Sequence, residues 1–158
     1  GMWDRCTGEQ LRRLNRLVNR IYDRELKDVG LKSTQFSLLA KALGEGAVTL
    51  TELAAHLGLD NSTLTRNVKP LVDMQLLQIR HSTVDARVKS VSLTPTGVVA
   101  VERGLASWAS AQCRIADALG PDGVAKLHAA LDEATQRIER FESPYSGPSQ
   151  DGRPERPA

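Results

Sequence analysis

The chain has 158 residues, of which 41% are hydrophobic and 25% are charged, as expected for a globular protein of one domain. The formal net charge is only +2, which excludes a uniformly basic nucleic-acid-binding protein. Any basic surface must therefore come from local clustering of lysine and arginine.

The cysteines and the apolar segments of the sequence indicate the cellular compartment of the protein. Cys6 and Cys113 are far apart in the sequence and form no CxxC motif, which fits a reducing environment. No apolar run approaches the roughly 20 residues that cross a bilayer, and no signal-peptide pattern opens the chain. We therefore expect a cytoplasmic protein with no membrane partner.

Two helices are predicted in the first part of the chain. Apolar residues recur with helical spacing over 11–29, arginines occupy the remaining surface, and Gly30 ends the helix. Ser33 or Thr34 then caps a second helix, which stops at residues 44–46.

A short extended segment and a brief third helix follow. Residues 48–50 are predicted to be extended, Thr51 to cap the helix, and Gly58 to supply the turn after it. In this helix Ala54 precedes the glycine by four residues, which allows the close crossing of a helix-turn-helix.

The next stretch, residues 60–71, reads DNSTLTRNVKPL and is predicted to be a fourth helix. Asp60 or Asn61 provides the N-cap. Pro70 predicts either a kink or a second half that is held by packing. On a 3.6-residue period one face is apolar, formed by Leu64, Val68, Leu71 and Val72.

The opposite face of this helix is polar and suits DNA. An α-helix fits the major groove, where arginine bridges guanine acceptors, asparagine bridges adenine, and hydroxyls bond to bases or phosphate. A solvated polar face is the alternative for the helix alone, and the preceding turn favours DNA. The residues on this face are Ser62, Thr63, Thr65, Arg66, Asn67 and Lys69.

The second half of the chain predicts a ribbon and two long helices. Residues 78–82 and 87–93 alternate apolar and polar positions, with Ile79, Val91 and Leu93 expected to face inward. Thr94 and Pro95 begin a fifth helix. A sixth helix carries apolar residues at coiled-coil spacing over 127–141, and a disordered tail rich in proline and glycine follows.

This order of elements is that of a winged helix. The predicted fold class is therefore mainly α (an α+β winged helix), with six helices and a small antiparallel β-wing that directly follows a helix-turn-helix. The apolar stripes of the first and last helices exceed what one small winged helix covers. They indicate a homodimer, and intramolecular packing is the alternative.

Three segments together resemble the MarR family of bacterial transcriptional regulators, over about residues 10–142. They are LKSTQFSLL (31–39), LAAHLGLDNSTLTRNVKPLVDMQLL (53–77) and DARVKSVSLTPTG (85–97). The resemblance implies a homodimer with dimerisation helices from both termini. Each subunit then presents a winged helix to half of a palindromic double-stranded DNA operator, with half-sites about 10 base pairs apart. Gln75 departs from the pattern, since many members have a glycine there.

The resemblance also assigns regions and residues. It implies a dimerisation helix over 1–32, a DNA-binding lobe over 33–95, dimerisation helices over 96–142, and a disordered tail over 143–158. The polar residues of the fourth helix look like recognition-helix residues, Arg87 matches the wing arginine, and Asp85 matches its acidic partner. On the residues alone, Asp85 and Arg87 also fit an ordinary surface ion pair.

Two kinds of signal are implied by the family. Members respond to small aromatic or phenolic effectors bound between the DNA-binding lobe and the dimer helices. By position Tyr22, Phe36 and Trp108 line such a cleft, and a core role fits them equally well. Other members sense oxidants through an N-terminal cysteine, here Cys6, which has arginines nearby in sequence. Cys113 is expected to be buried and inert.

No catalytic or metal-binding pattern is present. The histidines, His56, His81 and His128, are scattered, so we predict no enzyme, no metal and no cofactor. The predicted function is a homodimeric transcriptional regulator, a repressor released from DNA by a small ligand. The alternatives are a thiol-based redox-sensing regulator that uses Cys6, and a winged-helix protein–protein interaction module without specific DNA binding.

Overall fold

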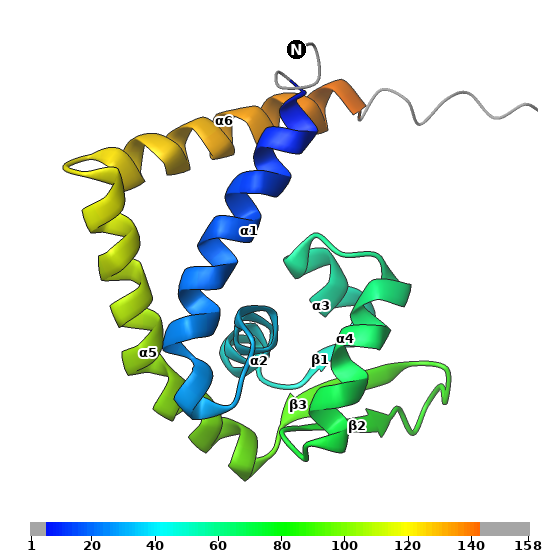
Figure 1. Ribbon diagram of the computed structural model, residues 1–158. Helices are drawn as coiled ribbons and strands as arrows, with labels where there is room; N and C mark the ends of the chain where they lie inside the picture. Colours follow the sequence, from blue (N-terminus) through cyan, green and yellow to red (C-terminus); the bar gives the residue numbers. More distant parts are fainter. Residues whose placement is uncertain (1–5, 143–158) are drawn as a thin grey trace, which may run out of the picture. The chain divides into compact units, whose positions relative to one another are not determined.

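The computed structural model describes residues 6–142, which form a mainly helical fold with a small three-stranded sheet. Figure 1 shows how these elements are arranged. The predicted winged helix is confirmed, and the predicted disordered tail lies outside the described residues. In chain order the elements are α1 (Thr7–Glu25), the 3-10 helix η2 (Lys27–Val29), α2 (Ser33–Glu45), β1 (Val48–Thr49), α3 (Leu50–Leu57), α4 (Asn61–Asp73), β2 (Leu77–His81), β3 (Lys89–Leu93), α5 (Pro95–Leu119) and α6 (Gly123–Glu142).

The described chain forms two compact units that meet within α5. The first unit ends at Ile115, and the second begins at Ala116 and contains α6. The hydrophobic core lies in the first unit and joins α2, α3, α4 and the sheet to the start of α5. Its most deeply buried side chains are Leu26, Leu39, Leu53, Leu64, Val68, Leu71, Leu77, Val91 and Val101. None of the helices in the described part of the chain has the length and apolar character that crossing a membrane requires.

The sheet has the strand order β1-β3-β2, with both pairings antiparallel. Val91 of the central strand pairs with Val48 on one side and with Ile79 on the other, and it is fully buried. Ile79 was predicted to face inward, but it is 38% exposed. It lies on an edge strand and so has a neighbouring strand on one side only, which leaves part of its side chain uncovered.

Two of the predicted helix caps were wrong for an identifiable reason. Helix α3 is capped by Thr49, whose hydroxyl accepts the Glu52 N–H (3.2 Å) while the Glu52 carboxylate accepts the Thr49 N–H (3.0 Å). This reciprocal pair satisfies two unpaired donors, which Thr51 cannot do. Helix α2 begins after Lys32, and its Ser33 N–H is held by the Asp23 carboxylate of α1 (2.6 Å). That cap comes from a different helix.

Helix α4 continues through Pro70 without interruption. Pro70 and Arg66 are both exposed, so water can bond to the Arg66 carbonyl that proline leaves without an N–H partner. Beyond the proline, Leu71 is fully buried and Leu76 is 6% exposed. The second half of α4 is therefore held by packing, as one of the two predicted alternatives states.

The turn after α4 keeps its shape although glutamine replaces glycine. Gln75 has φ of 59°, in the left-handed region. The Gln75 N–H donates to the Val72 carbonyl and the Leu76 N–H donates to the Leu71 carbonyl, both at 2.9 Å. This is the Schellman motif, which usually places glycine at this position. The local hydrogen bonds are retained at the cost of a strained glutamine.

The same turn is tied to the start of α5. The Thr94 N–H donates to the Leu76 carbonyl (3.1 Å), the Thr94 hydroxyl donates to the Gln75 carbonyl (2.6 Å), and the same hydroxyl accepts the Gly97 N–H (3.0 Å). A Cβ added at Gly97 would lie 2.0 Å from the Leu76 carbonyl oxygen. Glycine is therefore required for this approach of α5 to the end of α4.

Gly97→Ala is expected to lower the free energy of unfolding by about 3 kcal/mol or more, because the obstructing atom is a backbone oxygen that cannot rotate away. Urea unfolding followed by circular dichroism measures the change.

Gly44→Ala is the matched control, since a Cβ at Gly44 in α2 meets nothing within 4 Å. It is expected to raise the free energy of unfolding by about 0.5–1 kcal/mol through helix propensity. Equal stability of the Gly97→Ala protein and the unmodified protein would contradict the close approach.

Candidate nucleic-acid interface and adjoining cleft

Helices α3 and α4 form the helix-turn-helix. Gly58 ends α3 with φ of 63°, and the Leu59 N–H donates to the Ala54 carbonyl (2.9 Å). Ala54 is 2% exposed, as the close crossing of the two helices requires. Helix α4 packs against α3 and β2 (Figure 1), with Leu64, Val68 and Leu71 buried. This packing leaves the other side of α4 to solvent.

The N-terminus of α4 is organised by one carboxylate. Asp60 accepts hydrogen bonds from the Thr63 N–H (2.7 Å), the Ser62 hydroxyl (2.7 Å) and the Thr63 hydroxyl (2.8 Å). These bonds, first that of Ser62, lower the pKa of Asp60 to about 2. The carboxylate is thus ionised at neutral pH, and both hydroxyls point their hydrogens at it, so their oxygens are presented to solvent as acceptors.

The rest of the polar face is exposed along α4. The Thr65 hydroxyl donates to the Asn61 carbonyl (2.8 Å), the Arg66 guanidinium lies 3.3 Å from the Thr63 hydroxyl, and Lys69 pairs with Asp73 at 3.1 Å. Arg66 and Lys69 carry the positive charge of this face. The structure places all the predicted recognition-helix residues on one side of α4, with Thr63 half-buried and the others exposed.

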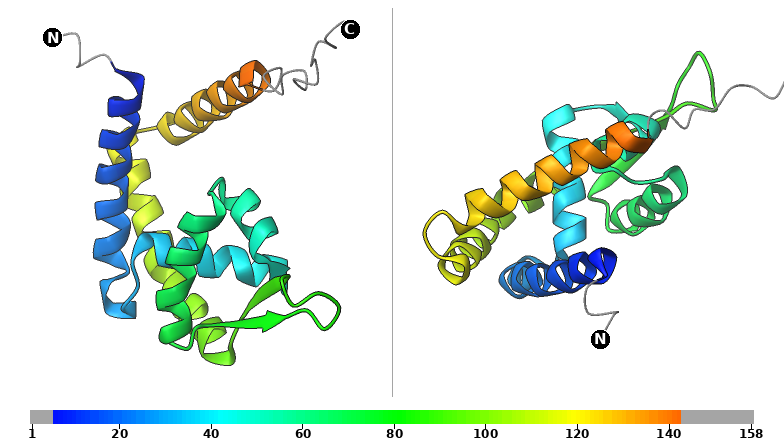
Figure 2. Two further views of the ribbon diagram at one scale, coloured as in Figure 1. Left: turned by 90° about the vertical axis from the view of Figure 1, so that its right-hand side faces the viewer. Right: turned by 90° about the horizontal axis from the view of Figure 1, so that it is seen from above.

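The wing is the loop of residues 82–88 between β2 and β3, and both views of Figure 2 show it extending away from the strands. At its tip the Asp85 carboxylate accepts the Arg87 backbone N–H (3.0 Å) and lies 3.4 Å from the Arg87 Nε. The Ser82 hydroxyl accepts the Val84 N–H (3.1 Å), which fixes the other side of the loop. The Arg87 side chain is 94% exposed, so this turn presents a solvent-accessible guanidinium beside the Asp85 carboxylate.

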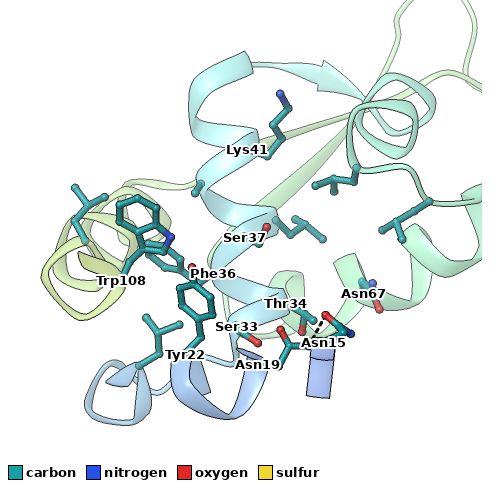
Figure 3. Close-up of a pocket in the computed structure, with 16 residues that line it drawn as sticks. Asn15, Asn19, Tyr22, Ser33, Thr34, Phe36, Ser37, Lys41, Asn67 and Trp108 are labelled. Atoms are coloured by element: carbon teal, nitrogen blue, oxygen red, sulfur yellow. Dashed lines mark hydrogen bonds between the residues drawn. The ribbon is translucent and has the colours of Figure 1, made fainter. Parts of the chain in front are cut away.

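A cleft with a volume of about 750 Å³ adjoins the helix-turn-helix and is lined by residues of α1, α2, α3, α4 and α5. Tyr22, Phe36 and Trp108, the three candidate ligand-binding residues, all line this cleft (Figure 3). Phe36 is 4% exposed and Trp108 is 41% exposed, so Phe36 also belongs to the core. The volume is that of ordinary small-molecule sites.

The sequence interpretation missed the polar lining of this cleft. Helical spacing offered a signal, because these residues recur every four positions along two helices and so share a face. They are Asn15 and Asn19 of α1, and Ser33, Ser37 and Lys41 of α2. Asn67 of α4 also lines the cleft, so one predicted DNA-binding residue belongs to both sites.

One of the two cysteines differs from expectation. Cys113 was predicted to be buried, but it is exposed on α5, whose small neighbours do not cover it. Cys6 is exposed at the N-cap of α1. The guanidinium groups of Arg12 and Arg16 both pair with Glu9, at 3.1 Å and 2.9 Å. Arg12 and Arg16 are thus engaged with a carboxylate.

Comparisons with known proteins identify relatives. A model described as MarR family matches residues 31–89. The structure of the transcriptional regulator MosR from M. tuberculosis in complex with DNA is 32% identical, with a TM-score of 0.72, covering 84% of this chain and 98% of that chain. A probable transcriptional regulator from Pseudomonas aeruginosa is 26% identical, with a TM-score of 0.74 and the same coverages.

A third structure shows the same fold at lower identity. BpsR from Bordetella bronchiseptica, whose DNA binding is regulated by 6-hydroxynicotinic acid, is 24% identical, with a TM-score of 0.73, and the match covers 83% of this chain and 94% of that chain. No curated protein matches the chain.

The Asp60 cap predicts a pH dependence. Its pKa in the folded state is about 2, below the ordinary value of 3.8, so its contribution to stability is complete above about pH 4 and is lost as the pH falls toward 2. In Asp60→Asn, which keeps a capping oxygen, acid destabilisation in this window is expected to be smaller. Thermal unfolding between pH 2 and about 5 measures it. Asp132→Asn on α6 is the control for removing an exposed carboxylate, and equal acid sensitivity of the two variants would contradict the assignment.

Proposed function

Because this chain belongs to the MarR family of DNA-binding transcriptional regulators, which are not enzymes, we propose that it is a homodimeric repressor of a palindromic operator. The observation that carries the proposal is the exposed polar face of α4 with the arginine-tipped wing beside it in the same compact unit. MosR, the relative at 32% identity, has been solved in complex with DNA.

The DNA-binding lobe is residues 33–95, and α4 is its recognition helix. In the major groove Arg66 donates to guanine acceptors, and Ser62 and Thr63 accept from the amino groups of bases because Asp60 holds their hydrogens. Lys69 and the N-terminal N–H groups of α4 contact phosphates. Helix α4 supplies base readout and positioning from one surface.

The wing supplies the second contact. Arg87 enters the adjacent minor groove, where the negative potential of a narrow groove attracts a guanidinium. Asp85 holds the backbone at Arg87 through a 3.0 Å hydrogen bond, which lowers the entropy lost when the arginine binds. The pair thus has a function beyond an ordinary surface ion pair.

Dimerisation is supported by apolar side chains that the single chain leaves exposed. On α1, Leu11 is 48% exposed and Leu17 is 44% exposed. On α6, Ile138 is 61% exposed and Phe141 is 74% exposed. Neither helix contains a fully buried residue. Burial of these side chains against a second copy favours association, so residues 1–32 and 96–142 form the dimerisation region.

A small aromatic ligand in the cleft releases the repressor from DNA. The lining of aromatic and apolar side chains with a few polar groups is that of a small-molecule site. For Cys6 the structure shows exposure, and Arg12 and Arg16 are paired with Glu9, whereas the cleft offers a formed small-molecule site, so we prefer ligand release to redox release. A regulator of this kind works in the cytoplasm, where bacterial DNA lies.

Arg87→Ala is expected to weaken operator binding by about tenfold or more and to reduce the slope of log Kd against log salt by about two, because each subunit of the dimer loses one cation from the DNA. Fluorescence anisotropy at several salt concentrations measures both. Arg103→Ala removes an exposed arginine from α5 and should change neither. An unchanged salt slope in Arg87→Ala would contradict the wing contact.

Ile138→Arg is expected to convert the dimer to a monomer at micromolar concentration, because a charge replaces an apolar side chain in the interface. Sedimentation velocity measures the mass. Gln136→Arg places the same charge two residues away and should leave the dimer intact. A monomer for the unmodified protein, or a dimer for Ile138→Arg, would contradict the assignment.

A further inference from the structure

The cleft contains a single cation among its lining residues, and that cation is already paired. Lys41 lies on α2, and its ammonium is 3.1 Å from the Glu45 carboxylate. Figure 3 shows the end of this side chain turned away from Tyr22 and Phe36. Glu45 also lies 3.4 Å from the Nδ1 atom of His56. The carboxylate therefore balances the charge of Lys41 outside the aromatic part of the cleft.

The N-terminus of α2 is a second source of positive potential beside the cleft, and a carboxylate compensates it as well. Ser33 and Thr34, at the N-terminus of α2, line the cleft, and the exposed N–H groups of a helix start normally attract anions. Here the Asp23 carboxylate accepts the Ser33 N–H at 2.6 Å, and the Gln35 side chain accepts the Lys32 N–H at 2.9 Å. An anionic ligand would meet a carboxylate at this point.

The remaining polar groups of the cleft are neutral. They are the amides of Asn15, Asn19 and Asn67, the hydroxyls of Ser33, Thr34 and Ser37, and the phenol of Tyr22. The Tyr22 hydroxyl is uncharged at neutral pH, since burial raises its pKa further above the ordinary value of 10.0, and it can donate a hydrogen bond to a ligand. Such groups satisfy amides, hydroxyls and ring nitrogens, but they do not neutralise a carboxylate that loses its water.

We propose that the cleft binds an uncharged aromatic compound with hydrogen-bonding substituents, that it discriminates against aromatic carboxylates, and that Asn67 couples this ligand to DNA. The proposal rests on the proposed function, because it concerns the effector of the same regulator. The aromatic ring lies among Tyr22, Phe36 and Trp108, and its polar substituents face the amides and hydroxyls.

Asn67 connects the two sites because it belongs to both. It is exposed on the recognition helix, and it lines the cleft on the side away from Trp108 (Figure 3). Its side chain makes no hydrogen bond to another described residue, so it is available to either a base or a ligand. A ligand that bonds to the Asn67 amide removes it from the base contact. By linkage, DNA and ligand then weaken each other by the same factor.

The first test compares salicylamide with salicylate, which have nearly the same shape and differ by one charge at neutral pH. Dissociation constants come from ligand-observed NMR with the full chain. Salicylamide is expected to bind about tenfold more tightly than salicylate, since burying an unpaired carboxylate is costly. Equal or tighter binding of salicylate, or binding of neither compound at millimolar concentration, would overturn the proposal.

Glu45→Gln provides the matched test of the charge argument. It frees Lys41 from its carboxylate, so the affinity for salicylate is expected to rise about fivefold or more while that for salicylamide stays constant. Glu52→Gln, which changes a carboxylate at the start of α3 outside the cleft, should change neither affinity. If the ratio of the affinities for salicylate and salicylamide is unchanged in Glu45→Gln, then Glu45 does not set the charge selectivity of the cleft.

The coupling is tested with two neighbouring substitutions on α4. Asn67→Ala is expected to weaken salicylamide binding about fivefold and to abolish the effect of salicylamide on DNA affinity. Arg66→Ala, which does not line the cleft, should weaken DNA binding and leave salicylamide binding unchanged. If salicylamide still lowers the DNA affinity of Asn67→Ala by the same factor as in the unmodified protein, then Asn67 does not couple the ligand to DNA. If the protein binds salicylamide but no DNA sequence, the proposed function fails while the ligand class stands.

Discussion

The contact between Gly97 and the Leu76 carbonyl fixes how the helix-turn-helix is joined to the long helix α5. A Cβ at Gly97 would lie 2.0 Å from the carbonyl oxygen, so the backbones touch without a side chain between them. Thr94 adds hydrogen bonds to Gln75 and Leu76 from the same place. Because β2 begins at Leu77 and β3 ends at Leu93, this joint also sets the base of the wing. Helix α4, the wing and α5 are therefore positioned together.

Residues of the short helix α4 lie in three environments, which are the core, the solvent-exposed surface and the cleft. Leu64, Val68 and Leu71 hold it in the core, Arg66 and its polar neighbours face solvent, and Asn67 reaches the cleft. In the proposed mechanism, a ligand at Asn67 does not have to act through a long chain of contacts, because it touches α4 itself. Under that proposal, the charge and the hydrogen-bonding pattern of the effector matter directly for DNA binding.

Much of the fold was predictable because its signals are local. The 3.6-residue period of 60–71 placed Leu64 and Val68 inward and Arg66 outward, as observed. The errors came where another part of the chain decides. Asp23 of α1 caps α2, and an edge position leaves Ile79 partly exposed.

In the candidate site, too, some residues could be predicted from the sequence, and others depend on how the helices pack. The aromatic lining was predicted by position in a resembling family, whereas the polar lining and the place of Asn67 depend on how α1, α2 and α4 pack. The exposure of Cys113 likewise depends on what packs against α5, which the composition of that helix does not reveal.

In the proposed complex, two copies of α4 and the wing read DNA as a symmetric pair. Selection of bound sequences from a random pool of duplex DNA by the purified full chain tests this most directly. An inverted repeat is expected, with half-sites about 10 base pairs apart, one helical turn, since each subunit reads one half-site. Enrichment of a single half-site, or of no sequence at all, would contradict it.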